Sequence, residues 1–192
     1  INEQKEAYII DPGARAKEID EYITEKDLVV LGIILTHGHF DHMYSINDVQ
    51  KLYQCPIYIY KDERDFLFDP NLNLSSTIAK SITVRAKSSV KLLEDSDQLK
   101  LGNNIIKIIH LPGHTRGGIG LLYKRFLFSG DTLFKGTIGR TDLPTSSKSA
   151  MDRSLKKILA ICKDNTVVYP GHGHFTTILT EKHENFYLKH YQ

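Results

Sequence analysis

The chain has 192 residues, of which 41% are hydrophobic and 25% charged, and its formal net charge at pH 7 is +2. This length can bury one sizeable core, and so small a charge offers no electrostatic footprint for a nucleic acid or an anionic membrane. No apolar run is long enough for a membrane span or a signal peptide, so we expect a cytoplasmic, single-domain protein (residues 1–192) with no nucleic-acid or membrane partner.

The first half of the chain alternates between β and α patterns. Strands are predicted at 7–10, 32–35 and 57–60, and helices at 14–26 and 41–54. Asp11-Pro12-Gly13 supplies turn chemistry after the first strand. The pattern weakens over 62–89, where only a short helix at 62–68 and a loop at 69–71 are predicted. Strands that alternate with helices on this scale favour an α/β layered fold.

The texture changes at residue 90 to short β runs separated by turns. Strands are predicted at 90–93, 98–101, 104–109, 119–123, 125–128 and 166–169, and helices at 148–162 and about 180–191. Gly102-Asn103 is a hairpin signal. We therefore expect the second half to open with antiparallel sheet, and the two halves to form two facing sheets with helices outside.

The two cysteines, Cys55 and Cys162, lie far apart and form no Cys-x-x-Cys pair. This usage favours neither a disulfide framework nor a thiolate zinc site. We expect both to be small buried apolar residues.

A dense group of potential metal ligands follows the second predicted strand, in the segment Thr36-His37-Gly38-His39-Phe40-Asp41-His42. Neutral imidazole and carboxylate are preferred ligands of zinc and of several other divalent metals. In extended backbone, residues two apart share a face, so His37, His39 and Asp41 are expected on one side. His42 is then expected to point elsewhere, and the loop could serve two neighbouring metals.

Three later turns repeat this arrangement, in which an apolar strand ends at a glycine and a potential ligand. They contain His114 after Gly113, Asp131 after Gly130, and His172 after Gly171. Loops at strand ends are where open α/β folds gather their sites, and glycines let the backbone come close to a ligand. Four such signals in one chain predict one common metal site.

Together these motifs resemble the metallo-β-lactamase superfamily, and within it the short bacterial branch of glyoxalase II-like (hydroxyacylglutathione hydrolase-like) enzymes. The likeness runs from Ile10-Asp11-Pro12-Gly13 to the last helix and includes the segment from Gly130 to Pro144. It implies a four-layer αβ/βα sandwich of two mixed sheets flanked by helices. Because that fold opens with a strand before residue 7, we expect this sequence, which begins at Ile1, to lack one or more N-terminal strands.

The resemblance also implies a site with two divalent ions. It divides seven ligands between them: His37, His39 and His114 on the first ion, Asp41, His42 and His172 on the second, and Asp131 as a bridge. This division agrees with the alternation argument for His37 and His39 but moves Asp41 to the other ion. Zinc is the expected metal, and iron and manganese also suit such ligands.

The implied reaction is hydrolysis of a thioester such as S-2-hydroxyacylglutathione or a related acyl thiol. Two divalent ions lower the pKa of a shared water from 15.7 toward about 7, which gives a bridging hydroxide as the nucleophile. Asp131 and Asp41 are the implied catalytic carboxylates. Asp41 has two interpretations, as a ligand of the second ion and as a hydrogen-bond acceptor for the bound water.

Two further residues have both an implied role and a plainer one. Asp11 resembles the position that steadies the ligand loop, and it is also an ordinary turn aspartate. Arg140 stands where glyoxalase II enzymes carry a basic residue that binds glutathione, so it is the candidate for binding a substrate carboxylate; the alternative is a solvated surface arginine. Of the other histidines, His174 is expected near the metal cleft without being a ligand, and His110, His183 and His190 to be structural or solvated.

Other activities share this scaffold. A persulfide dioxygenase-like oxidoreductase would hold a single iron with His37 or its equivalent, His114 and Asp131, whereas the presence of all second-metal residues favours a hydrolase. A lactonase is a further alternative. A β-lactamase of the common dizinc type would have a cysteine at position 131, and a nucleic-acid processing enzyme would have a basic surface. A non-catalytic scaffold is disfavoured because every expected ligand is present.

Overall fold

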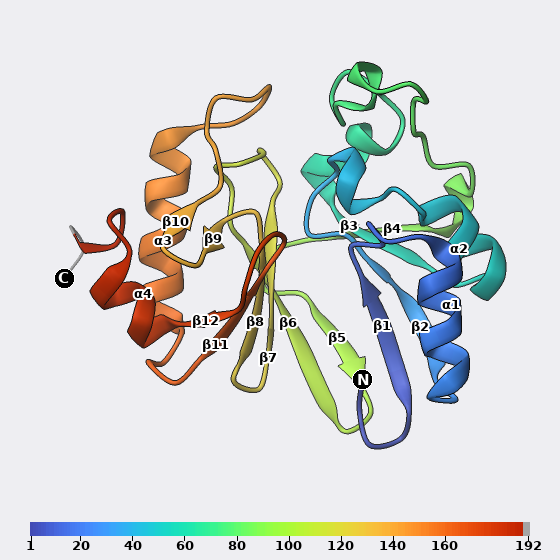
Figure 1. The fold of residues 1–192 in the computed structure, drawn as a ribbon, viewed down its shortest axis with the longest axis horizontal. Helices are drawn as coiled ribbons and strands as arrows, with labels where there is room; N and C mark the ends of the chain where they lie inside the picture. The colour runs from blue at the N-terminus through green and yellow to red at the C-terminus, as the bar shows by residue number, and fades with distance from the viewer. Residues whose placement is uncertain (190–192) are drawn as a thin grey trace. The chain divides into compact units, whose positions relative to one another are not determined.

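The computed structural model describes residues 1–189, and the chain divides into two units (Figure 1). The first unit comprises Ile1–Leu93 and Lys100–Ile105, and the second comprises Glu94–Leu99 and Ile106–Gln192. Each unit has its own sheet, its own helices and its own apolar core.

The first unit is built on a parallel sheet with strand order β1-β2-β3-β4. Its elements are β1 (Glu6–Ile10), α1 (Ala16–Glu25), β2 (Val29–Ile34), α2 (Ile46–Tyr53), β3 (Ile57–Tyr60) and β4 (Val90–Leu93). Helix α2 buries Ile46 and Val49 in the same core as Ile33 and Ile57 of the sheet. The predicted alternation of strands and helices is confirmed, because each helix hides an apolar stripe against the sheet.

The prediction that residues 90–93 open an antiparallel sheet is wrong. Strand β4 lies parallel to β3, with Ile57 opposite Val90 and Tyr60 opposite Leu93. Parallel neighbours need a crossover connection of a dozen or more residues, and the weakly patterned stretch 61–89 provides it. Local β texture cannot reveal this, since the direction of a strand depends on the path of the preceding connection.

The crossover itself is ordered around a buried asparagine. It contains short 3₁₀ turns at Lys61–Leu67, Ser75–Thr77 and Lys87–Ser89. The Asn73 amide donates to the carbonyl oxygens of Phe66 (2.7 Å) and Ile82 (2.9 Å). A buried amide whose bonds are satisfied fixes an irregular segment as a ladder of backbone bonds fixes a strand.

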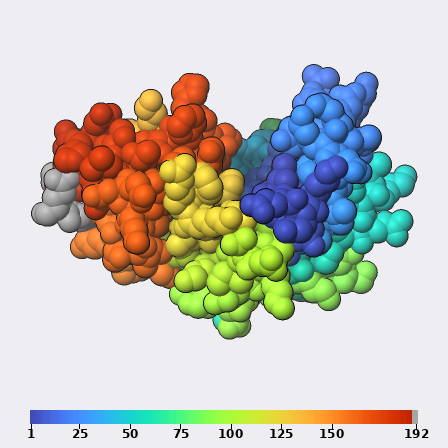
Figure 2. All heavy atoms as spheres, turned by 90° about the horizontal axis from the view of Figure 1, so that it is seen from below, coloured from blue at the N-terminus to red at the C-terminus, as the bar shows by residue number. Residues whose placement is uncertain are grey.

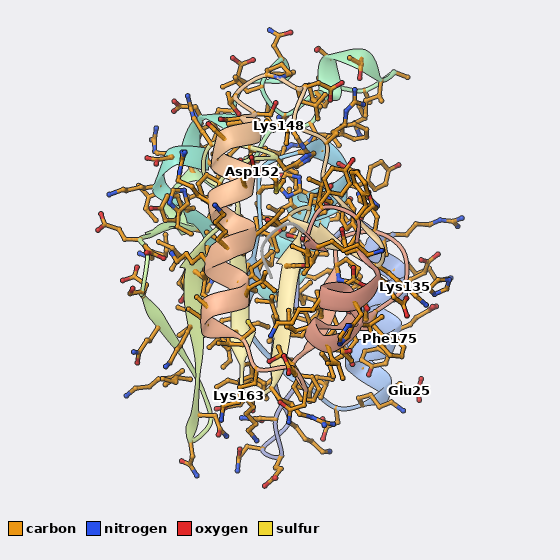
Figure 3. The ribbon with its side chains drawn as sticks, turned by 90° about the vertical axis from the view of Figure 1, so that its left-hand side faces the viewer. Glu25, Lys135, Lys148, Asp152, Lys163 and Phe175 are labelled. Atoms are coloured by element: carbon orange, nitrogen blue, oxygen red, sulfur yellow. The ribbon has the colours of Figure 1, made fainter. Side chains whose placement is uncertain are left out.

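The second unit is built on a mixed sheet with strand order β12-β11-β8-β7-β6-β5. Its elements are β5 (Gln98–Leu101), β6 (Asn104–His110), β7 (Ile119–Tyr123), β8 (Phe126–Gly130), α3 (Lys148–Ile161), β11 (Val167–Pro170), β12 (Thr176–Thr177) and α4 (Ile178–Glu184), with the separate two-stranded pair β9 (Leu133–Phe134) and β10 (Thr137–Ile138). Figure 3 looks onto α3, which begins at Lys148 and ends shortly before Lys163. The short strands β9, β10 and β12 were not predicted, because two residues carry no periodic signal.

The predicted turn at Gly102-Asn103 lies between β5 and β6, and Gly102 has a φ of 61°. The tip of this hairpin belongs to the first unit: the Gly102 N–H donates to Glu6 (2.8 Å), and the Tyr8 hydroxyl donates to the Lys100 carbonyl (3.2 Å). Figure 2 shows the yellow-green hairpin beside the dark blue N-terminal residues. Strand β1 is thereby connected to a segment distant in the sequence.

Two predicted helices differ from the observed ones. The helix expected at 41–54 begins only at Ile46, because the Ser45 N–H donates to the Pro12 carbonyl and not to residue 41. The helix expected at 180–191 is α4, which starts at Ile178, where the Thr177 hydroxyl accepts the Thr180 N–H, and stops at Glu184. The end of that prediction, and the assignment of His190, fall outside the described residues.

Both cysteines are buried, as predicted. Burial raises the pKa of both thiols, that of Cys162 to about 11. Within residues 1–189, no helix is both long and apolar enough to cross a bilayer.

Candidate metal centre

The first unit presents its potential ligands on the loop that leaves β2. Four side chains of this loop are almost fully buried: Thr36, His37, His39 and His42. The Asp11 carboxylate, on the turn after β1, accepts hydrogen bonds from the Thr36 N–H (2.7 Å) and the Thr36 hydroxyl (2.6 Å). Adjacent parallel strands end at the same edge of a sheet, so the turn after β1 can hold the loop after β2.

The histidine rings of this loop gather at one place. His37 Nε2 lies 3.1 Å from His39 Nδ1, and the ring centroids of His37 and His42 are 4.1 Å apart. The expectation that His42 points away from His37 is therefore wrong. Residues Phe40–His42 form a 3₁₀ turn, which ends the two-residue alternation after His39.

Hydrogen bonds determine which ring nitrogens remain available. The Thr36 hydroxyl donates to Asp11, so at 3.2 Å it accepts from His37 Nδ1 and leaves His37 Nε2 as the basic nitrogen. His42 Nδ1 donates to Asp11 Oδ2 at 2.8 Å, which leaves His42 Nε2 basic, 3.8 Å from Asp41 Oδ2. Such partners fix ring orientation and tautomer in metal sites.

Two glycines let this loop pack closely. A Cβ on Gly38 would lie 2.3 Å from Phe66 Cβ, and a Cβ on Gly13 would lie 2.4 Å from the Asp41 carbonyl oxygen. The Gly38 N–H donates to the buried carboxylate of Glu63 at 2.9 Å. Sequence reasoning missed Glu63 and Phe66, because they lie in the stretch whose pattern is weak.

The second unit brings together three residues that are far apart in the sequence. His114 follows β6, Asp131 follows β8 and His172 follows β11. Asp131 Oδ2 lies 3.5 Å from His114 Nε2 and 3.6 Å from His172 Nε2. Strands β8 and β11 are parallel neighbours, with Gly130 opposite Pro170. Both strands therefore end, and the backbone turns, at the same edge of the sheet. His114 and Asp131 are nearly buried, whereas the His172 side chain is 56% exposed.

The backbone of Arg140 orients His114. His114 Nδ1 lies 2.9 Å from the Arg140 carbonyl oxygen, which can only accept, so Nδ1 carries the proton and Nε2 faces Asp131 as the basic nitrogen. A Cβ on Gly139 would lie 1.8 Å from the Asp131 carbonyl oxygen. Only glycine therefore allows the backbone at position 139 to pack against the backbone of Asp131.

The guanidinium of Arg140 is engaged by a neighbour that the sequence analysis did not single out. Its Nε and Nη2 donate to the two oxygens of Asp142, at 2.7 and 2.9 Å. The hydrogen bond with Asp142 raises the pKa of Arg140, and it lowers the pKa of Asp142. Both side chains are exposed, so a solvent-borne carboxylate can reach the same guanidinium.

The donor sets of both units fit a divalent metal. Ligand atoms around a tetrahedral zinc ion, each about 2.05 Å from it, lie roughly 3.3 Å from one another. The pair His37–His39 (3.1 Å) and the pairs of Asp131 with His114 (3.5 Å) and His172 (3.6 Å) have this spacing. All are nitrogen or oxygen donors, the types that zinc, iron and manganese accept.

The chain belongs to the metallo-β-lactamase superfamily: the model of that family, described as "Metallo-beta-lactamase superfamily", matches residues 1–172. This membership, together with mixed and parallel sheets flanked by helices, confirms the expected α/β fold class.

Individual relatives agree with this assignment. "Probable metallo-hydrolase YqgX" of Bacillus subtilis is 36% identical over 94% of this chain and 86% of its own length. "Hydroxyacylglutathione hydrolase GloC" of Haemophilus influenzae is 33% identical, over 97% of this chain and 89% of its own. Among solved structures, "BLEG-1 B3 metallo-beta-lactamase" has a TM-score of 0.91 and 37% identity, and the match covers 97% of this chain and 90% of that one.

Proposed function

We propose that the protein is a dinuclear metal-dependent hydrolase that cleaves a thioester, S-2-hydroxyacylglutathione or a related acyl thiol. The observation that carries the proposal is that each unit supplies a ligand set with metal-like spacing, from residues that match the superfamily motifs. The relative GloC, named as a hydroxyacylglutathione hydrolase, supports the substrate class. In this proposal the two ligand sets share two ions: His37, His39 and His114 at one, Asp41, His42 and His172 at the other, and Asp131 at both.

The two ions, when bound, supply a hydroxide nucleophile at neutral pH and polarise the substrate carbonyl. The protein's own contribution is the orientation of the ligands. Asp11, through Thr36 and His42, and the Arg140 carbonyl, through His114, keep the protons on Nδ1 so that each Nε2 is basic. The Asp41 carboxylate is 41% exposed beside His42, so it can also accept a hydrogen bond from the attacking water.

Arg140 is proposed to bind a carboxylate of the thiol carrier. To do so, it must exchange Asp142 for the substrate. An exposed ion pair contributes at most about 1 kcal/mol, so this exchange is energetically easy. The bidentate pairing with Asp142 supports this proposal, because a substrate carboxylate has the same planar pair of oxygens.

A second candidate activity is hydrolysis of β-lactams. It is favoured by the 37% identity and TM-score of 0.91 to BLEG-1, a protein named as a B3 metallo-β-lactamase. The absence of a cysteine at position 131 argues only against the type that uses one. Both activities require attack on a carbonyl, so substrate must be tested directly.

The test is a substrate panel on protein whose metal content is first measured. The panel contains S-acyl thiols, lactones, β-lactams and persulfides. We expect two metal ions per chain, hydrolysis of S-2-hydroxyacyl thiols, and loss of activity after chelation with recovery on adding zinc, iron or manganese. One iron per chain with persulfide oxidation and no thioester hydrolysis would overturn the proposal and support the dioxygenase alternative.

A further inference from the structure

We infer that Glu181 and Asn185, a buried polar pair at helix α4, are positioning residues for the metal ligands of the second unit. The inference rests on the proposed function in taking His114, Asp131 and His172 as ligands. It concerns residues that hydrogen-bond to the segment between Asp131 and Arg140, and they act on the three ligands through that segment.

That segment contacts every potential ligand of the second unit. It begins with Asp131 itself. The ring of Phe134 packs edge-on against the ring of His172, with centroids 6.3 Å apart. The carbonyl of Arg140 accepts the Nδ1 proton of His114 at 2.9 Å. A displacement of this one segment would therefore change the positions of all three ligands.

The start of this segment is anchored in the unit, because Leu133 is fully buried in the apolar core and its carbonyl accepts the Ser129 hydroxyl at 2.8 Å. The tip, residues 134–137, is exposed or half-buried. Strands β9 and β10 are two residues long, and among residues 1–189 they form a two-stranded sheet that no other strand joins. The tip is at Gly136, whose φ is 74°, and a Cβ there would meet nothing within 4 Å. An isolated two-stranded hairpin is at best marginally stable in water.

Helix α4 and the residue after it attach the tip of the segment. The Gly136 N–H donates to Glu181 Oε2 at 2.9 Å, and the Asn185 amide donates to the Thr137 carbonyl at 3.0 Å. A longer contact of 3.5 Å joins the same amide to the Phe134 carbonyl. Figure 3 shows Lys135, which precedes Gly136, beside the short helix α4.

Glu181 and Asn185 are themselves held rigidly. Both are 0% exposed. Glu181 Oε1 accepts the Thr176 hydroxyl at 2.6 Å, Oε2 accepts the Asn185 amide at 2.7 Å, and Asn185 Oδ1 accepts the Tyr187 N–H at 3.0 Å. A buried carboxylate is costly to desolvate, and apolar residues could pack α4 at lower cost. Apolar side chains could not hold the backbone of residues 134–137 by hydrogen bonds, which is what this pair does.

The test compares metal affinity, since a purely structural role would lower stability without a specific effect on metal binding. Glu181→Gln keeps the side-chain shape but cannot accept all three hydrogen bonds, and Asn185→Leu removes the amide. We expect each variant to bind zinc about tenfold or more weakly in competition with a chelator. We also expect an altered visible spectrum of the cobalt-loaded protein.

Two control variants make the result decisive. Glu184→Gln changes an exposed carboxylate of the same helix, and Ile158→Ala lowers stability from the buried face of α3. Both should bind zinc as the unmodified protein does. The inference is overturned if Glu181→Gln and Asn185→Leu bind zinc normally. It is also overturned if Ile158→Ala, with a melting temperature similar to theirs, weakens zinc binding as much as they do. Zinc affinity is measured without substrate. A failed thioester assay would therefore contradict the proposed function, whereas the zinc affinities of the variants would still test the positioning role of Glu181 and Asn185.

Discussion

The four potential ligands of the first unit lie within six consecutive residues, whereas those of the second are spread from His114 to His172. The first set is held by two carboxylates: Asp11 bonds to Thr36 and His42, and Glu63 accepts the Gly38 N–H. The second set is contacted by the segment from Asp131 to Arg140, whose tip is hydrogen-bonded to Glu181 and Asn185. A contiguous set depends on the groups around one loop, and a dispersed set depends on the packing of a whole unit.

The largest effect is expected at the residue that the dispersed set converges on. Asp131→Ala should lower kcat by about a thousandfold or more, because in the proposed site Asp131 is shared by both ions and its removal would forfeit several kcal/mol of charge stabilisation. Asp164→Asn, an exposed carboxylate of the same unit, should leave kcat unchanged. Steady-state kinetics on metal-loaded protein measures both; a fully active Asp131→Ala variant would refute the site.

The contiguous set should be most sensitive at Asp11. Asp11→Asn keeps the shape but turns one acceptor oxygen into a donor, so the bonds to Thr36 and His42 cannot all survive. We expect zinc affinity to fall about 10- to 100-fold. The control is Asp27→Asn, an exposed acid of the same unit. Equal affinities in the two variants would mean that Asp11 is only a turn residue.

Adding a side chain to Gly38, in the loop that carries the contiguous ligand set, should destabilise the protein. Gly38→Ala places a methyl group 2.3 Å from Phe66 Cβ, inside the buried crossover. We expect a loss of about 1–3 kcal/mol in the free energy of unfolding, the usual cost of overpacking. Chemical denaturation of the metal-free protein provides the measurement, and an unchanged midpoint would contradict the close packing.

The smallest effect is expected at Asp95, which belongs to neither ligand set. Burial disfavours ionisation of Asp95, but hydrogen bonds from the His110 N–H and from Lys157 outweigh it and hold its pKa below the ordinary value. Its contribution to stability is therefore present above the unfolded-state pKa of about 3.9 and is lost as the pH falls through the folded-state value. Asp95→Asn should be less stable at pH 7, by about 1 kcal/mol or less because the pair is half exposed, and the difference should shrink toward pH 3.

What could be predicted from the sequence also differs between contiguous features and features that depend on distant contacts. The loop from His37 to His42 is visible as a motif, and the alternation of helices and strands is visible as periodicity. The direction of β4 was not predictable, because it depends on a connection without a pattern. Glu63, Glu181 and Asn185 were missed because they bond to backbone groups, and sequence carries no local signal for such bonds. Asp142 pairs with the Arg140 guanidinium two residues away, and an exposed ion pair of this kind has no sequence pattern that distinguishes it from other surface charges.

The central claim is that the contiguous and the dispersed ligand sets bind two neighbouring ions. The most direct test is electron paramagnetic resonance of protein loaded with two manganese ions per chain. We predict exchange-coupled spectra at two ions per chain, and their loss in Asp131→Ala. Spectra of two magnetically isolated ions, or binding that saturates at one ion per chain, would contradict the account.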